Sequence, residues 1–338
     1  MIKKIIILLS IITLFIVSIL YWQFSQALNT KLLFEEGKQS YFLTIKPGSS
    51  ISAFSKQLER EGWIKDRFWL RNYGRLFPQQ ANIKAGTYQV DTNSSVLALL
   101  NQVVQGKEHQ FNVTFIEGTR FTDALKALKE HPYIHHSLTT DTVVEIAEKL
   151  GITNDNPEGL IFPDTYAFTA GTLDITLLKR AYVKMQNHLT TLWQQRNFDL
   201  PYETPYQALI MASIIEKETS HVPEQTLISA VFVNRLNKNM RLQTDPTVIY
   251  GLGERYQGDI TRAHLREKTA YNTYRINGLP PTPIAMVGLS ALKAALNPQE
   301  SDYLYFVSQG NGQHTFSRTL KEHNIAVQAY LAGQARNK

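Results

Sequence analysis

The 338-residue chain contains no cysteine. Disulfide bonds, thiolate metal sites and a cysteine nucleophile are therefore excluded. The nine histidines form no His-Glu-x-x-His sequence, and the adjacent His135 and His136 cannot share one face of a helix. The sequence therefore predicts no metal site and no cofactor.

Motifs for several other functions are also missing. The chain has no Gly-x-Ser-x-Gly turn for a serine nucleophile, and Ser213 falls inside a predicted helix. It has no glycine-rich phosphate-binding loop. No run of Lys and Arg exceeds two residues and no nucleic-acid-binding motif occurs, so nucleic acid is not an expected partner. The net charge of +6 still suits a polyanion such as anionic lipid or a cell-wall polymer.

The N-terminal segment is almost continuously apolar. The run from Ile5 to Trp22 carries no charge. It is long enough to span a bilayer and longer than the apolar part of a usual signal peptide. We therefore expect a single transmembrane helix over 5–24, followed by a linker over 25–40.

The flanking charges predict the orientation of this helix. Lys3 and Lys4 precede the apolar run, which favours a cytoplasmic end at residues 1–4. The protein is then a single-pass protein of the inner (cytoplasmic) membrane with its body in the periplasm. The alternative is a cleaved signal peptide, because residues 25–27 (Ser-Gln-Ala) resemble a cleavage site.

Residues 41–106 are expected to form a small α/β module. Its elements are a strand, a Pro-Gly turn, a helix, a second strand and a second helix, at 41–45, 47–48, 49–62, 86–90 and 95–105. The order resembles a LysM-type carbohydrate-binding module. The alternative is that any small strand–helix unit needs a turn glycine and a capping serine.

A similar strand–turn–helix pattern recurs 70 residues later. The corresponding pairs are Thr44 and Thr114, Gly48 and Gly118, Ser49 and Thr119, Ile51 and Phe121, Leu58 and Leu128, and Ile64 and Ile134. Two copies are too few for a solenoid, so the pattern indicates a duplicated or coincidentally similar module.

Residues 107–338 are expected to form a mixed α+β domain, and the fold class of the soluble part is α+β. The expected elements are helices within 141–199 and at 223–237 and 288–296, a hairpin of 303–307 with 314–316, and a last helix that begins at a Thr319–Glu322 capping box. Residues 238–287 show little periodicity and are expected to be irregular.

A helix is also predicted from 204 to about 219. Thr204 suits the N-cap, Pro205 suits the first helical position, and Gln207 completes a capping box. Two carboxylates, Glu216 and Glu218, lie near the end of this helix.

Helical geometry distinguishes the two carboxylates. At 100° per residue, Glu218 lies on one stripe with the apolar Met211, Ile214 and Ile215, and Glu216 lies roughly 160° away. A carboxylic acid held against apolar side chains has a raised pKa, as a general acid near neutral pH requires. The alternative is that Glu218 is only the polar edge of a half-buried helix.

Further motifs accompany this helix along the chain. They lie at 158–166, 231–236, 241–250, 271–274, 278–281 and 314–316. In this order and spacing, together with residues 212–219, they resemble the YceG-like family of endolytic murein transglycosylases. The resemblance extends to about Leu331. It implies that Glu218 is the catalytic residue and that the module at 41–106 is LysM-like.

The resemblance also implies an activity and partners. Lytic transglycosylases of this family cleave the MurNAc–GlcNAc bond within nascent peptidoglycan strands, which terminates elongation. One Glu protonates the glycosidic oxygen and then takes the proton of the muramyl C6 hydroxyl, so that a 1,6-anhydro ring closes. The implied partners are glycan strands, the inner membrane and peptidoglycan synthases such as penicillin-binding proteins.

Two other functions remain open. A muramidase-type hydrolase uses water and two carboxylates on opposite sides of the bond. Glu216 and Glu218 point apart, so the second carboxylate would be Asp164, Asp245 or Glu254. A wall-binding scaffold without activity is the third possibility.

Other polar residues are candidates for contacts with sugar or peptide groups, although each could equally be a structural hydrogen-bonder. The substrate-binding candidates are Asn234, Arg235, Gln243, Thr244, Asp245, Tyr271, Asn272, Tyr274 and His314. The supporting candidates are Glu158, Asp164, Tyr166 and Glu216.

Overall fold

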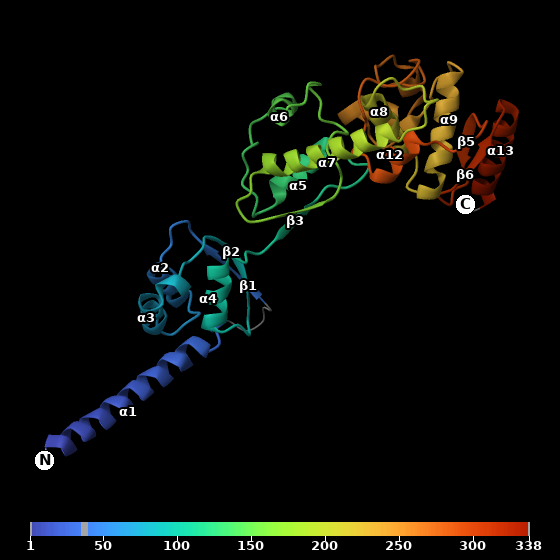
Figure 1. Ribbon diagram of the computed structural model, residues 1–338. Coiled ribbons are helices and arrows are strands. Elements are labelled where there is room, and N and C mark those ends of the chain that lie inside the picture. The colour runs from blue at the N-terminus through green and yellow to red at the C-terminus, as the bar shows by residue number, and fades with distance from the viewer. Residues whose placement is uncertain (1, 35–39, 337–338) are drawn as a thin grey trace. The chain divides into compact units, whose positions relative to one another are not determined.

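The structure is a computed structural model that describes residues 2–34 and 40–336 (Figure 1). The chain divides into two compact units. Unit 1 comprises residues 1–111 and 167–171, and unit 2 comprises residues 112–166 and 172–338. Part of the expected linker, residues 35–39, and the first residue of the expected cytoplasmic end lie outside the described residues.

Helix α1 (Ile2–Asn29) contains the apolar N-terminal run. Within the described part of the chain it is the one helix that is long and apolar enough to cross a membrane. It is longer than the expected 5–24, and its last turn enters the core of unit 1. Leu28 is buried there, and Phe24 stacks on Tyr73 with 6.1 Å between the ring centroids. An apolar helix of this length is consistent with a single-pass membrane anchor.

Unit 1 contains a two-stranded antiparallel sheet and short helices. Strand β1 (Ser40–Ile45) pairs with β2 (Gly86–Asp91), with Thr44 opposite Thr87. The helices are α2 (Ile51–Arg60), α3 (Phe68–Leu76), η1 (Pro78–Gln80) and α4 (Val96–Gln105). The strands and helices expected in the module are therefore present. Helix α3, which buries Leu70 and Tyr73, was not expected.

Unit 2 is mainly helical. Its elements in chain order are β3 (Phe111–Thr114), α5 (Phe121–Glu130), α6 (Val143–Leu150), β4 (Thr165–Phe168), α7 (Asp174–Gln194), α8 (Pro205–Glu218), η2 (Val222–Glu224), α9 (Gln225–Asn237), α10 (Asp245–Leu252), η3 (Gly253–Arg255), α11 (Arg262–Arg266), α12 (Leu289–Leu296), β5 (Tyr305–Ser308), β6 (His314–Ser317) and α13 (Leu320–Arg336). The division between the units passes through β3 and β4, which pair with each other. The fold is mixed α+β, as expected.

The region 238–287 is less irregular than its sequence suggests. It contains α10, η3 and α11, so the expectation of a wholly irregular segment is wrong. Helix α10 has a proline near its start, and Thr261 caps α11 by accepting the N–H of His264. These helices have eight and five residues, which is too short for a recognisable apolar period.

The recurring strand–turn–helix pattern corresponds to two similar structures. In each, a threonine hydroxyl bonds a threonine of the paired strand, Thr44 with Thr87 at 3.0 Å and Thr114 with Thr165 at 2.9 Å. A glycine with positive φ then turns the chain into a helix, at 76° for Gly48 and 71° for Gly118.

The similarity continues through the second strand and helix of each copy. The hydroxyls of Tyr88 and Tyr166 donate to the carbonyl four residues earlier, at 3.0 and 2.7 Å. Helix α4 buries Val96, Leu99, Leu100 and Val103, and α7 buries the residues 78 positions later, Asp174, Leu177, Leu178 and Ala181. This agreement in hydrogen bonds and burial favours a duplicated module over a coincidental similarity.

Candidate active site

Helix α8 carries the two candidate carboxylates. Thr204 Oγ1 accepts the N–H of Gln207 at 3.2 Å, and Pro205 is the first helical residue, as predicted. The Gln207 side chain accepts from the N–H of Glu203 rather than that of Thr204. The local sequence therefore sets the start of the helix, which ends at Glu218.

The expected single apolar stripe on α8 is wrong. All residues from 208 to 215 are buried, because the helix contacts α7, α9, α10 and α12. Glu216 and Glu218 lie where the helix leaves this core. Burial raises the pKa of both side chains, so their positions on the helical wheel do not distinguish them.

Glu218 faces a cleft of about 380 Å³ in unit 2. The cleft is formed by the ends of α8 and α9, the segment 242–245, strand β5 and the start of α13. Its lining residues are Glu218, Phe232, Arg235, Leu242, Gln243, Asp245, Tyr274, Tyr305, Phe306, Leu320 and His323. Five of them are candidates from the sequence: Glu218, Arg235, Gln243, Asp245 and Tyr274.

Thr244 makes the direct contact with the candidate acid. Its hydroxyl donates a hydrogen bond to Glu218 Oε1. The backbone N–H of Thr244 donates to Thr273 Oγ1 at 3.0 Å. Gln243, the preceding residue, has a φ of 54°, a strained value for a residue other than glycine. The strained turn thus directs the Thr244 hydroxyl at the carboxyl group.

The surroundings of Glu218 favour its protonated form. Burial raises its pKa, and the nearby Asp245 carboxylate adds to the increase. The Thr244 hydrogen bond and the charges of His314 and Arg235 act in the opposite direction. The negative end of the α8 dipole also disfavours a carboxylate at the last helical residue. Glu218 can therefore hold a proton and deliver it to a ligand in the cleft.

Glu216 has different neighbours. Its Oε2 accepts the backbone N–H of Gly288 at 3.0 Å, which links α8 to the start of α12. Burial raises its pKa to about 7, and Glu117 contributes to the increase. Gly288 leaves little space, because a Cβ there would lie 2.3 Å from a carboxyl oxygen of Glu117. Glu216 does not line the cleft.

Arg235 joins two walls of the cleft. It is 8% exposed, and it donates to the carbonyls of Leu304 at 2.7 Å and Leu242 at 2.8 Å. Its guanidinium lies 5.1 Å from the ring centre of Tyr305. The adjacent Asn234 donates to two carbonyls between α12 and β5 and lies outside the cleft lining.

The candidates at 271–274 divide into one cleft residue and two residues with partners elsewhere. The Tyr274 hydroxyl donates to Asp245 Oδ1 at 2.7 Å, inside the cleft. Asn272 is fully buried and donates to three backbone carbonyls in 264–267. The Tyr271 hydroxyl bonds that of Thr282 at 2.8 Å.

His314 lies at the start of β6. Its Nδ1 is 2.8 Å from Glu224 Oε2, and its backbone N–H donates to the other carboxylate oxygen at 3.1 Å. This pairing attaches the hairpin to η2. The residue does not line the cleft, but its charge lowers the pKa of Glu218.

The remaining supporting candidates lie outside the Glu218 cleft. Glu158 accepts the N–H of Phe121 at 2.9 Å and the hydroxyl of Tyr250 at 3.3 Å, and burial raises its pKa to about 7. Asp164 forms an ion pair with Lys184, and Tyr166 is buried beside it.

Several cleft residues were not recognised from the sequence. Tyr305 and Phe306 are adjacent aromatic residues of β5, and both line the cleft, although neighbouring residues of a strand normally face opposite sides. His323 and Leu320 are three residues apart at the start of α13 and share one face. Among the described residues, no group of three or more His, Asp or Glu side chains is arranged to hold a metal ion.

Comparison with known proteins agrees with the motif pattern. A family model described as "YceG-like family" matches residues 43–329. This chain belongs to the YceG-like family. The residues matched by the family model include most of each structural unit and the cleft around Glu218.

Named relatives of this YceG-like protein are similar along most of its length. The endolytic murein transglycosylase of Bacillus subtilis (strain 168) is 30% identical over 317 residues, which cover 89% of this chain and 87% of the relative. An endolytic murein transglycosylase of Streptococcus pneumoniae is 24% identical over 347 residues, covering 90% of this chain and 62% of the relative. A crystal structure of a yceG-like protein from Listeria monocytogenes is 29% identical, with a TM-score of 0.49, and the match covers 86% of this chain and 100% of that one.

Proposed function

We propose that this YceG-like protein is an endolytic peptidoglycan lytic transglycosylase. The observation that carries the proposal is Glu218, whose burial raises its pKa and which faces a cleft. The names of the relatives support the reaction class. The proposed target is the MurNAc–GlcNAc bond within nascent glycan strands, and cleavage there would terminate their elongation.

The proposed reaction uses one carboxyl group twice. Protonated Glu218 gives its proton to the glycosidic oxygen as the bond from C1 to that oxygen breaks. The resulting carboxylate then takes the proton of the muramyl C6 hydroxyl while O6 bonds to C1. The product is a 1,6-anhydro-MurNAc end, no water is consumed, and Glu218 is protonated again.

The other groups of the cleft have supporting roles in this proposal. The Thr244 hydroxyl orients the carboxyl group and stabilises its charged form after the first proton transfer. Tyr305 and Phe306 offer flat surfaces for sugar rings. Gln243 and Asp245 offer polar atoms for hydroxyl or acetamido groups.

Asp245 is the feature that favours a water-using hydrolase instead. It lies in the same cleft as Glu218 and raises its pKa by its charge. A second carboxylate is what a hydrolase requires. One oxygen of Asp245 accepts the Tyr274 hydroxyl, which fixes the carboxylate beside Glu218.

The products distinguish these reactions. Purified glycan strands are digested and the fragments are weighed by mass spectrometry. Anhydro ends lack one water relative to hydrolysed ends. Hydrolysed ends alone would support the muramidase, and the absence of any cleavage would support a wall-binding scaffold.

The location of the enzyme is part of the proposal. Helix α1 would hold the protein in the inner membrane with its N-terminus in the cytoplasm and the catalytic unit in the periplasm. Peptidoglycan synthases are then within reach as partners, and a LysM-like module at 41–106 would contact glycan. Mass spectrometry of the mature N-terminus tests the anchor, because a protein beginning at Leu28 would show that the segment is removed.

A further inference from the structure

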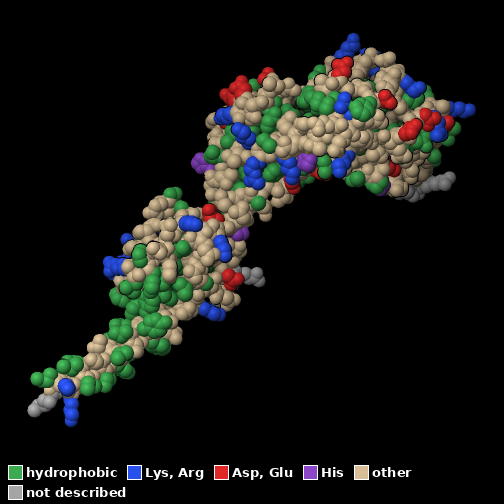
Figure 2. Space-filling view, in the orientation of Figure 1, with side chains coloured by type: hydrophobic (Ala, Val, Ile, Leu, Met, Phe, Trp, Pro, Cys, Tyr) green, Lys and Arg blue, Asp and Glu red, His purple; other side chains and the backbone are tan. Residues whose placement is uncertain are grey.

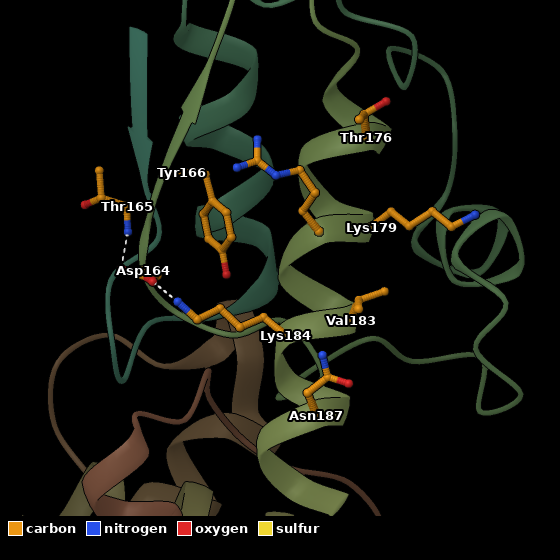
Figure 3. Close-up of a pocket in the computed structure, with 9 residues that line it drawn as sticks. Asp164, Thr165, Tyr166, Thr176, Lys179, Val183, Lys184 and Asn187 are labelled. Atoms are coloured by element: carbon orange, nitrogen blue, oxygen red, sulfur yellow. Dashed lines mark hydrogen bonds and ion pairs between the residues drawn. The ribbon is translucent and has the colours of Figure 1, made fainter. Parts of the chain in front are cut away.

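A second hollow of unit 2 lies between β4 and α7 (Figure 3). It has a volume of about 610 Å³ and is open to solvent along the helix. We call it the α7 groove. Its lining residues are Asp164, Thr165, Tyr166, Thr176, Lys179, Arg180, Val183, Lys184 and Asn187.

The α7 groove carries an excess of positive charge. Three cationic side chains and one carboxylate line it, so its formal charge is +2. Lys184 reaches across to Asp164, whereas Lys179 points away from that carboxylate (Figure 3). Among the described residues, no carboxylate lies within ion-pair distance of Lys179. Burial and then the charges of Lys184 and Lys293 lower the pKa of the neighbouring His188, and Asp164 acts in the opposite direction.

The first copy of the duplicated module lacks these cations. The residues of α4 that correspond to Lys179 and Arg180 are the neutral Asn101 and Gln102, and the position of Lys184 corresponds to Gly106, which ends α4 as its C-cap. The buried residues and the tyrosine hydrogen bond are nevertheless equivalent in the two copies. The charge therefore belongs to the surface of the second copy rather than to its core.

The groove offers more than charge. Lys179 and Lys184 are five residues apart, or about 7.5 Å along the helix and roughly 140° around it, so they present charge on two sides of α7 (Figure 3). Thr165, Thr176 and Asn187 add hydrogen-bonding groups, and Val183 is an exposed apolar residue. This arrangement suits an extended anion with several carboxylates better than a single small ion.

The groove belongs to the same compact unit as the Glu218 cleft. Helix α7 contacts α8, which ends at Glu218, and α12. The two hollows share no lining residue.

We propose that the α7 groove binds the carboxylate-bearing stem peptide of the murein strand whose glycan is cleaved at Glu218. This inference rests on the proposed function. Muramyl sugars carry short acidic peptides, and their carboxylates complement Lys179, Arg180 and Lys184. Binding of the peptide selects peptide-bearing strands over bare glycan.

The test compares two substrates and two double variants of the full-length protein. The groove variant is Lys179→Gln with Arg180→Gln. The control is Lys126→Gln with Lys268→Gln, which removes the same charge from exposed positions elsewhere in unit 2. The substrates are glycan strands with their peptides and strands from which an amidase has removed the peptides.

Wild-type protein is expected to prefer peptide-bearing strands. The groove variant should lose about three- to tenfold in kcat/KM on these strands, on the order expected for two exposed charge contacts, and distinctly less on stripped strands. The control variant should keep the wild-type preference. Added salt should reduce the preference of the wild type and change that of the groove variant little. Equal losses on both substrates would overturn the proposal and indicate a structural role.

A binding measurement keeps the inference separate from the proposed activity. Fluorescence anisotropy with a labelled stem peptide that lacks sugar should show binding to wild type and weaker binding to the groove variant. Binding to anionic phospholipid vesicles without peptide binding would overturn the proposal in favour of a lipid-facing surface. If no strand is cleaved but the peptide still binds through Lys179 and Arg180, the proposed function fails and the groove assignment stands.

Discussion

Glu216 and Glu218 are two residues apart on α8, yet they face two different regions of the molecule. Glu216 points into the contact between α8 and α12, where it accepts the N–H of Gly288. Glu218 points into a cleft, where it accepts the hydroxyl of Thr244. Burial raises the pKa of both side chains. A raised pKa is therefore not enough to identify a catalytic acid, because access to a ligand is also required.

The two regions also differ in what they demand from the carboxyl group. In the α8–α12 contact, a static acceptor is sufficient. In the cleft, the group must give up and regain a proton, and Thr244 can stabilise the carboxylate in between. The following predictions test this difference, beginning with the largest expected effect.

Glu218→Gln should abolish the proton transfer and retain the size of the side chain. We expect turnover to fall by at least about 10²–10⁴-fold, the usual contribution of general acid–base catalysis. Release of anhydro ends from purified strands measures the loss, and wall binding and thermal melting should stay close to wild type. An active Glu218→Gln protein together with an inactive, well-folded Glu216→Gln protein would reverse the comparison.

Thr244→Val should reduce turnover by roughly ten- to hundredfold, because a hydrogen bond to a charged group is worth about 1.5–3 kcal/mol. The Thr244 hydroxyl lowers the pKa of Glu218, so its removal should raise that pKa further. Because the acid must start protonated, the decline of activity at high pH should move to higher pH. A pH–rate profile measures the shift, and Thr244→Ser should restore the wild-type profile. An unchanged profile would show that the hydroxyl does not act on Glu218.

Glu216→Gln should cost less than about tenfold in activity. Gln retains an oxygen for the N–H of Gly288, and an ordinary hydrogen bond contributes only about 0.5–1.5 kcal/mol. The steady-state turnover rates of the Glu216→Gln and Glu218→Gln variants, measured side by side, test this difference. A pH–rate profile that loses one of its limbs in this variant would instead assign a proton-transfer role to Glu216.

The smallest expected effect is on how the thermal stability of the protein changes with pH. The pKa of Glu216 is about 7 in the folded protein, above its ordinary value of 4.5. A raised carboxyl pKa favours the folded state fully below the unfolded value and loses this contribution as pH rises through the folded value. The melting temperature of wild type should therefore fall between about pH 5 and 8, and that of Glu216→Gln should fall less. The pKa of Glu158 is also raised, so the melting temperature of the Glu216→Gln variant should still fall somewhat over this pH range.

Local signals in the sequence predicted several elements closely. The apolar run became α1, and Thr204 and Pro205 begin α8 as expected. The hairpin of β5 and β6 is present, and Thr319 and Glu322 form the expected capping box before α13. These features depend on residues within a few positions of one another. Helices α10 and α11 were missed because they are short and show no clear apolar period, whereas α3 was missed although its apolar residues gather on one side.

The candidate site was only partly predictable. Glu218, Arg235, Gln243, Asp245 and Tyr274 do line one cleft. Asn234 and Asn272 look like ligand-binding residues in the sequence, but their amides bond backbone carbonyls. Residue type does not show whether a polar group is already satisfied within the fold.

The sequence by itself determined the long apolar N-terminal helix, the start and end of α8 and the presence of two carboxylates at its end, because caps and hydrophobic runs act locally. Only the tertiary structure decided which carboxylate meets a cleft. The neighbours that separate the two are Gly288, 72 residues from Glu216, and Thr244, 26 residues from Glu218. Such contacts are set by the packing of α8 among four other helices, and helical periodicity carries no information about them.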